Sequence, residues 1–247
     1  MDGLLLVHAF PVGARMWEPQ LPALEAIGIP VVAPDLPGFG GTTDPPGGIM
    51  TMRSAADRCL EALDVAGVDR AMVCGLSMGG YVAFELWRAA RERILGMVLA
   101  NTRAQADPAE GAEGRRELAR RLREEGNVLV ADPPPLLSDH APEELWSRVR
   151  GLIAGQSAEA IAAASLGMAE RPDSTPDLPT IDVPTLVVTS DDDTLIPPEV
   201  TATIAGAVPG ATLTTLDGVG HLSNLEAPEA FDRALHAHLG RCGMVPG

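Results

Sequence analysis

Two kinds of hydrophobic pattern alternate along the chain. Short apolar or β-branched runs occur at 4–7, 30–34, 71–74, 94–100, 185–189 and 211–216, and helical patterns separate most of them. An unbroken apolar run is typical of a strand covered on both faces, whereas apolar residues spaced by three and four are typical of an amphipathic helix. The chain therefore predicts an α/β fold with a mostly parallel sheet and helices on both of its faces.

The segment between the fourth and fifth predicted strands lacks strand signals. The pattern predicts helices over 110–125, 142–153 and 158–170, and further helices over 16–27, from 51, over 79–91, over 198–207 and over 227–239. We interpret residues 105–180 as a helical cap inserted into a core formed by 1–104 and 181–247. We expect this cap to be mobile and to gate a mostly apolar pocket, because its helices are interrupted by proline-rich breaks.

The stretch from Val73 to Gly80 places a serine between an apolar run and a predicted helix. Its G-x-S-x-G pattern, with Ser77 at the centre, is typical of a nucleophile at a sharp strand-to-helix turn, where small neighbours are needed. Such a turn aims the first amides of the following helix at the hydroxyl, so they can stabilise an oxyanion. The alternative is a glycine-rich connection with a capping serine.

The composition narrows the classes of partner. The net charge of −16 argues against nucleic acid and anionic membranes as partners, because phosphates would be repelled. The three cysteines form no C-x-x-C pair, and the apolar run near the amino terminus is too short for a signal peptide. A reducing cytoplasm is the default expectation, and homo-oligomerisation stays open.

A candidate acid and a candidate base follow the serine in the chain. His221 comes after the last predicted strand, with glycines before it and a helix after it, and three consecutive aspartates, 191–193, follow the strand at 185–189. Nucleophile, acid and base in this order match the Ser-His-Asp pattern of acyl-transfer enzymes. The aspartate run also fits a solvated turn or a cation site, but no H-E-x-x-H motif or Cys/His set supports a metal.

Several stretches together resemble the α/β-hydrolase superfamily over nearly the whole chain. They are His8-Ala9-Phe10-Pro11, Arg15-Met16-Trp17-Glu18-Pro19-Gln20, the run from Ala33 to Gly40, Gly75-Leu76-Ser77-Met78-Gly79-Gly80, and the run from Gly220 to Glu226. The second and fourth are most similar to the branch of 3-oxoadipate enol-lactonases and small carboxylesterases. The resemblance implies the α/β-hydrolase fold with a helical cap.

The resemblance also implies roles for particular residues. In this superfamily the acid is usually an aspartate four residues before a proline, which selects Asp193. Successive residues of an extended segment point to opposite sides, so Asp192 is the least expected substitute and Asp191 is the runner-up. The oxyanion amides would be those of Phe10 and Met78. This chain departs from the superfamily in having Ala9 after His8 where glycine is commoner, and it starts near a strand that relatives reach after a β-hairpin. We therefore expect about six strands, with the strand around Val31 and Val32 at the edge.

The expected function is hydrolysis of a small carboxylic ester or lactone through an acyl-serine intermediate, with no cofactor and no metal. Alternatives on the same fold are a biosynthetic cyclase or lyase, a perhydrolase and a non-enzymatic ligand receptor. Arg103, at the end of a strand, is the candidate cation for a substrate carboxylate, with a salt bridge to a cap acid as its alternative. Trp146 and Met168 are candidates for lining the pocket, with plain packing as theirs.

Overall fold

A six-stranded parallel sheet forms the centre of the protein. The computed structural model describes residues 1–245. The strands have the order β2-β1-β3-β4-β5-β6, and every neighbouring pair is parallel. Their bounds are Asp2–Val7 (β1), Val31–Val32 (β2), Arg70–Leu76 (β3), Ile94–Ala100 (β4), Thr185–Ser190 (β5) and Thr212–Leu216 (β6). The six strands and the edge position of β2 confirm the prediction from the sequence.

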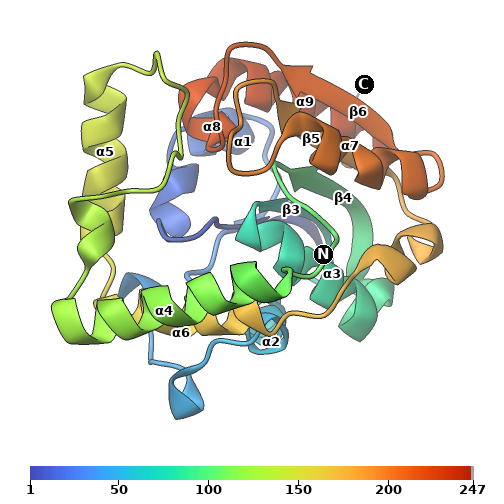
Figure 1. Ribbon diagram of the computed structural model, residues 1–247. Coiled ribbons are helices and arrows are strands. Elements are labelled where there is room, and N and C mark those ends of the chain that lie inside the picture. The colour runs from blue at the N-terminus through green and yellow to red at the C-terminus, as the bar shows by residue number, and fades with distance from the viewer. Residues whose placement is uncertain (246–247) are drawn as a thin grey trace.

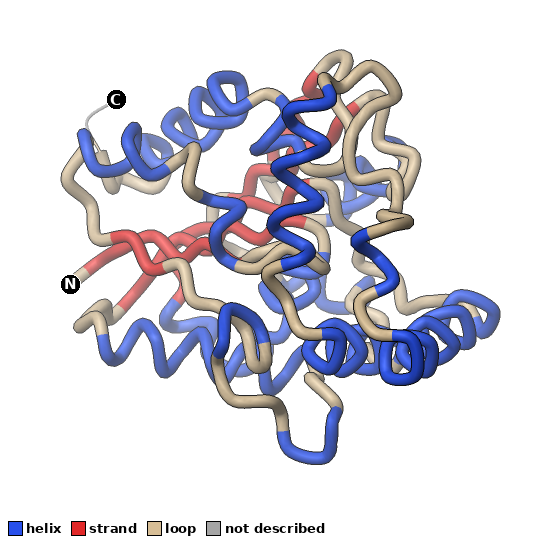
Figure 2. Tube along the Cα trace, turned by 90° about the vertical axis from the view of Figure 1, so that its left-hand side faces the viewer, coloured by secondary structure: helices blue, strands red, loops and turns tan. Residues whose placement is uncertain are grey.

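Helices cover both faces of the sheet. In Figure 1, α1 and α9 lie on one side of the strands, and α2 and α3 lie on the other; the turned view in Figure 2 shows the strands between helices. The helices outside the 105–180 segment are α1 (Leu21–Ala26), α2 (Met52–Val65), α3 (Met78–Ala90), α7 (Pro198–Ala207), α8 (Ser223–Glu226) and α9 (Pro228–Arg241). Short 3₁₀ helices are Ala14–Trp17, Phe39–Gly41, Pro46–Gly48 and Arg91–Arg93.

The helix predicted over 16–27 is wrong in its extent. The chain instead forms the 3₁₀ helix Ala14–Trp17, a turn, and then α1. Pro19 lies in the turn and Pro22 in the first turn of α1. Proline has no backbone N–H and clashes with the preceding turn, so a continuous helix through Pro19 is disfavoured. The apolar spacing that predicted one helix arises because both short helices contribute buried residues, among them Trp17 and Leu24.

Between β4 and β5 the chain forms three α-helices. They are α4 (Ala109–Glu125), α5 (Glu143–Ala154) and α6 (Ala158–Ala169), with the 3₁₀ helices Val128–Val130 and Thr175–Thr180. In Figure 1, α4 and α6 run side by side, and α5 stands apart from them. A bidentate ion pair from Arg123 to Glu159 joins α4 to α6. Among residues 1–245 no single helix is long and apolar enough to cross a membrane; α5 and α6 pass that test only as a pair bent by 91°.

The order of the strands determines what lies together at the carboxyl edge of the sheet. β3, β4, β5 and β6 are consecutive neighbours, so the residues that follow them meet at one edge. Ser77 follows β3, Asn101 follows β4, Asp193 follows β5 and His221 follows β6. Side chains as far apart in the sequence as Asn101 and Asp193, 92 positions, thus form a hydrogen bond.

Candidate active site

Ser77 sits in a strained backbone conformation between β3 and α3. Its φ is 56° and its ψ is −113°, a region that residues with a Cβ rarely occupy. Such a conformation costs about 1–3 kcal/mol and persists only where the surroundings hold it. Here the amide of Ser77 donates to the carbonyl of Ala100 at 2.9 Å, and its carbonyl accepts from Thr102 Oγ1 at 2.8 Å. The serine turn is therefore tied to the neighbouring strand β4.

The glycines around Ser77 are required by close backbone approach. A Cβ at Gly75 would lie 2.2 Å from the carbonyl oxygen of Gly79, and a Cβ at Gly79 would lie 2.1 Å from the carbonyl oxygen of Val7. Contacts this short do not occur in real structures, so neither position accepts a side chain without a backbone shift. The G-x-S-x-G pattern thus reflects the packing of α3 against β1 and β3.

Asp193 is buried in the loop after β5 and accepts hydrogen bonds on both carboxylate oxygens. Oδ1 accepts from the amides of Leu195 at 3.0 Å and Ile196 at 2.9 Å, and Oδ2 accepts from Asn101 Nδ2 at 3.0 Å. Burial by itself raises the pKa of this carboxyl, but the charge and hydrogen bond of His221, together with the donors above, outweigh it and hold the pKa of Asp193 below its usual value. The site therefore favours an aspartate anion.

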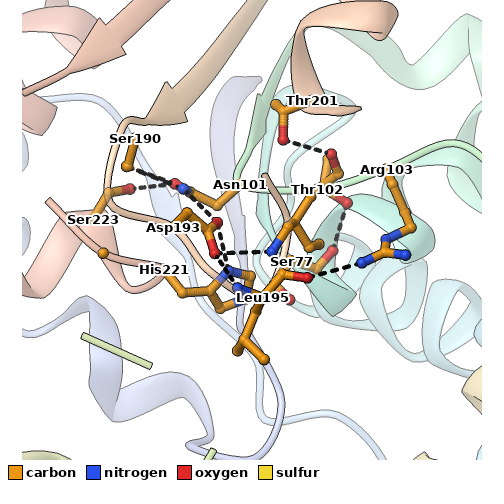
Figure 3. A network of polar contacts seen from close by, with 12 residues as sticks. Ser77, Asn101, Thr102, Arg103, Ser190, Asp193, Leu195, Thr201, His221 and Ser223 are labelled. Carbon is orange, nitrogen blue, oxygen red and sulfur yellow. Dashed lines mark hydrogen bonds and ion pairs between the residues drawn. The ribbon is translucent and has the colours of Figure 1, made fainter. Parts of the chain in front are cut away.

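His221 is oriented by Asp193. Its Nδ1 lies 2.8 Å from Asp193 Oδ2, and both residues are almost completely buried (Figure 3). Because an ionised carboxylate only accepts, Nδ1 carries the proton and Nε2 of the neutral ring is left as an acceptor. The loop that carries His221 is fixed by Glu226, whose Oε2 accepts from the amides of Gly220 at 3.0 Å and Ser138 at 3.1 Å.

The other two aspartates of the run lie elsewhere. Asp191 Oδ1 accepts from the amides of Gly218 at 2.6 Å and Val219 at 3.4 Å, so it holds the turn that precedes His221. Asp192 is exposed and lies 3.7 Å from the ring of His140. Of the three carboxylates, only that of Asp193 hydrogen-bonds to His221 in the described residues.

The loop after β1 is held by a neutral histidine. His8 Nε2 accepts from the amide of Leu36 at 3.1 Å, which leaves the proton on Nδ1 facing the carbonyl of Ala9 at 3.0 Å. Burial lowers the pKa of His8, in keeping with this neutral form. Phe10, which follows Ala9, lines the same cavity as Ser77, and Met78 begins α3 directly after Ser77. The amides of Phe10 and Met78 donate to no backbone carbonyl in the part of the chain that the structure describes.

A cavity of about 450 Å³ opens above these residues. Ser77 and His221 both line it, with further residues from the loops after β4 and β5 and from the 105–180 segment. The other lining residues are Phe10, Tyr81, Arg103, Arg115, Leu118, Leu129, Asp132, Pro133, Pro134, Pro135, Leu136, Met168, Leu195 and Ile196. The structure thus places Met168 at the cavity, as the sequence suggested. Trp146 does not line it; this residue of α5 is half-buried and packs against the apolar core instead.

Arg103 lines the cavity and forms no ion pair with the 105–180 segment. The alternative prediction for Arg103, a salt bridge to an acidic residue of the cap, is therefore wrong. Its Nη2 donates to the carbonyl of Leu195 at 2.9 Å, and its Nε is buried without an acceptor among residues 1–245 (Figure 3). Arg115, also at the cavity, pairs with Asp107. Of these two arginines, Arg103 is the one whose charge is not paired with a carboxylate among residues 1–245.

Comparison with known proteins decides the family. A model of the alpha/beta hydrolase family matches residues 4–234. The chain belongs to this family. As a family member it is an enzyme of the alpha/beta hydrolase type, in keeping with the serine turn and the buried histidine–aspartate pair.

Similar members of the family are esterases and lactonases. The structure of a thermophilic esterase from Thermogutta terrifontis, with malate bound, is 37% identical, covers 98% of this chain and 90% of its own, and superposes with a TM-score of 0.92. The enol-lactonase from Burkholderia xenovorans LB400 is 26% identical over 97% of this chain and 92% of its own, with a TM-score of 0.86. The 3-oxoadipate enol-lactonase 2 of Acinetobacter baylyi is 27% identical over 96% of this chain and 88% of its own length.

The structure adds residues around the site that the sequence did not identify. Asn101 contacts Asp193, Glu226 fixes the His221 loop, and Tyr81 stacks beneath the guanidinium of Arg171 at 4.1 Å while lining the cavity. For Asn101 the available signal was its place after a predicted strand, next to the strand that carries the serine. Glu226 carried no such signal, because its partners are two backbone amides and the hydroxyl of Ser138, a residue far away in the sequence.

Proposed function

We propose that this alpha/beta hydrolase is a serine hydrolase that cleaves a small carboxylic ester or lactone through an acyl-Ser77 intermediate. One observation carries the proposal. Ser77 lines the same cavity as His221, whose Nδ1 is held 2.8 Å from the buried carboxylate of Asp193. A nucleophile, a base and an acid arranged in this way are the requirements for acyl transfer.

The proposed reaction begins with attack of Ser77 Oγ on the carbonyl carbon. His221 Nε2 takes the hydroxyl proton, and Asp193 stabilises the resulting imidazolium. The carbonyl oxygen becomes an oxyanion, to which the free amides of Phe10 and Met78 would donate. Collapse of the tetrahedral intermediate expels the alkoxide, which receives the proton from His221. A water molecule then repeats these steps on the acyl-enzyme and releases the carboxylic acid and free Ser77.

The cavity supports a small substrate beneath a cap. Its volume of about 450 Å³ lies at the small end of ligand pockets, and its walls combine core residues with Leu118, Met168 and the prolines 133–135 of the 105–180 segment. We therefore propose that residues 105–180 act as a cap that closes over the substrate and shapes its acyl or alcohol group.

Arg103 supports a substrate that bears a carboxylate. Arg103 lines the cavity, forms no ion pair among residues 1–245 and donates only from Nη2, to the carbonyl of Leu195, so its guanidinium charge is available to an anionic ligand. The opposing charge at the cavity is Asp132, which is exposed. The esterase from Thermogutta terrifontis, determined with malate bound, shows that a related structure holds a molecule with carboxylates.

A fluorophosphonate probe and p-nitrophenyl acetate test the proposed mechanism. The probe should label Ser77, and the Ser77→Ala variant should lose both labelling and turnover. Ser147→Ala, which removes an exposed hydroxyl from α5, serves as the matched control and should behave like the wild type. Turnover that persists in Ser77→Ala, or a label on another residue, would contradict the proposal.

The substrate charge is tested with p-nitrophenyl hemisuccinate against p-nitrophenyl butyrate. Arg103→Gln should reduce kcat/KM for the acidic ester by about tenfold to a hundredfold, the value of one charge-assisted hydrogen bond, and should affect the neutral ester much less. Arg116→Gln changes the net charge equally on the exposed face of α4 and is the control. An unchanged ratio between the two esters in Arg103→Gln would remove this role.

A further inference from the structure

Asn101 occupies an unusual position directly after β4. Its side chain is completely buried, and its φ of 45° lies in the left-handed region. Among residues 1–245, Asn101 and Ser77 are the only two non-glycine residues with a positive φ. Asparagine, aspartate and glycine tolerate this region best. Its amide donates to the carbonyl of Val188 in β5, which fixes the backbone against the strand that carries Asp193.

The side chain of Asn101 bridges three elements of the site. Nδ2 donates to Asp193 Oδ2 at 3.0 Å and to Ser190 Oγ at 3.0 Å, and Oδ1 accepts from Ser223 Oγ at 2.7 Å (Figure 3). The orientation of the amide follows from its partner: a carboxylate cannot donate, so the NH₂ group faces Asp193. Ser223, in α8, lies two residues after His221, so this bridge links the acid loop to the base loop.

We propose that Asn101 is a positioning residue for the Asp193–His221 pair, an inference that rests on the proposed acyl-serine mechanism. The same oxygen, Oδ2, accepts from both Asn101 and His221, while the amides of Leu195 and Ile196 bind Oδ1. The carboxylate is thereby prevented from rotating, and its lone pair stays aimed at Nδ1. The hydrogen bond from Asn101 Nδ2 also partly offsets the negative charge that the Asp193 carboxylate presents to His221.

The identity of the residue follows from these two constraints. Glycine would accept the left-handed backbone but supplies no donor, and aspartate would place a second carboxylate against Asp193 at about the same distance, where two like charges repel strongly. Asparagine alone combines a left-handed backbone with a short, neutral donor. Among the charged groups nearby, His221 contacts Asp193 directly, Arg103 reaches the carbonyl of Leu195, and Asp191 bonds to the turn before His221.

The experiment compares Asn101→Gly and Asn101→Asp with a control at the same depth. Thr201→Val removes a buried hydrogen bond to the carbonyl of Thr102, next to Asn101, and touches neither Asp193 nor His221. Two readouts are used: the pH profile of kcat/KM on p-nitrophenyl acetate, and the titration of the Asp193 carboxyl by ¹³C NMR, assigned by its loss in Asp193→Asn.

We expect Asn101→Gly to lower kcat by about tenfold to a hundredfold, the loss expected for one charge-assisted hydrogen bond. The Asp193 carboxyl should titrate at higher pH, because its anion has lost a donor, and the acid limb of the kcat/KM profile should move to higher pH, because the less-stabilised anion favours protonated His221. Asn101→Asp should lose more activity than Asn101→Gly. Thr201→Val should change thermal stability and leave both the profile and the titration in place.

The proposal is overturned if Asn101→Gly has the same kcat and the same Asp193 titration as the wild type. It is also overturned if Asn101→Asp is fully active. If neither variant folds, Ser223→Ala decides: it frees only the Oδ1 end of Asn101 and should shift both readouts in the same direction by less, and unchanged readouts overturn the proposal. A wild-type protein without esterase turnover would contradict the proposed function alone. The carboxyl titration would still report whether Asn101 acts on Asp193.

Discussion

Replacing Asp193 with asparagine is the sharpest perturbation of the proposed triad. The carboxylate accepts four hydrogen bonds, two on each oxygen, from the amides of Leu195 and Ile196, from Asn101 and from His221. An asparagine has one acceptor oxygen. With that oxygen placed toward the two backbone amides, its NH₂ group faces two other donors, Asn101 Nδ2 and His221 Nδ1.

This conflict changes the tautomer of His221. Nδ1 can satisfy the new NH₂ group only as an acceptor, which moves the ring proton to Nε2, where the base must be free to take the Ser77 proton. The loss of turnover should be on the order of 10⁴-fold, as in other Ser-His-Asp enzymes with this substitution. At about 1.36 kcal/mol for each factor of ten, this is about 5.4 kcal/mol of transition-state stabilisation.

The assay is steady-state hydrolysis of p-nitrophenyl acetate by three single variants. Asp191→Asn keeps an oxygen that can accept from the amide of Gly218, and Asp192 is exposed, so these two variants should retain nearly full activity. Circular dichroism should show that Asp193→Asn is folded. An active Asp193→Asn protein together with an inactive Asp191→Asn protein would refute the assignment of the acid.

Three further predictions concern stability and motion. Gly79→Ala should destabilise the fold by about 3 kcal/mol or more in thermal denaturation, because its Cβ would lie 2.1 Å from a backbone oxygen. The control is Gly114→Ala in α4, where a Cβ would have no atom within 4 Å, and it should stabilise the fold by about 0.5–1 kcal/mol. Equal changes in stability in the two variants would contradict the packing argument. Burial lowers the pKa of His8, so below about pH 6.5 this side chain is protonated in the unfolded chain but stays neutral in the folded chain. The free energy of unfolding should therefore fall as the pH drops through that value. Urea titrations at several pH values should show a smaller decrease in the free energy of unfolding for His8→Gln than for the wild type. An equal pH dependence in the two proteins would contradict the role given to His8. Amide hydrogen exchange should be faster in residues 105–180 than in the sheet, and slower exchange there would oppose a mobile cap.

The sequence was sufficient for the sheet and for two members of the site. Buried parallel strands leave unbroken apolar runs, so the strands and the edge position of Val31–Val32 could be predicted. Ser77 and His221 could be identified because their glycine-rich flanks mark turns at strand ends. The choice of Asp193 as the candidate acid required a family resemblance, since composition alone does not separate Asp193 from the two aspartates before it.

Other parts of the site depend on contacts that no local pattern encodes. Asn101 reaches Asp193 only because β4 and β5 pair with Ala100 beside Val188, a register that the sequence does not display. Trp146 was a plausible pocket residue by size and place, but the orientation of α5 turns it toward the core. Glu226 accepts from the amides of Ser138 and Gly220 and from the Ser138 hydroxyl, and Ser138 lies 88 positions away in the chain, so no local pattern marked its role.

The most direct test of the proposed mechanism is to trap the acyl-enzyme. Protein mixed with p-nitrophenyl acetate is quenched in acid during the first turnover, digested and examined by mass spectrometry. The mechanism predicts an acetyl group on the peptide that contains Ser77, at Ser77 itself, and no such adduct in Ser77→Ala or His221→Ala. Turnover without an acetylated Ser77, or with the acetyl group on another residue, would contradict it.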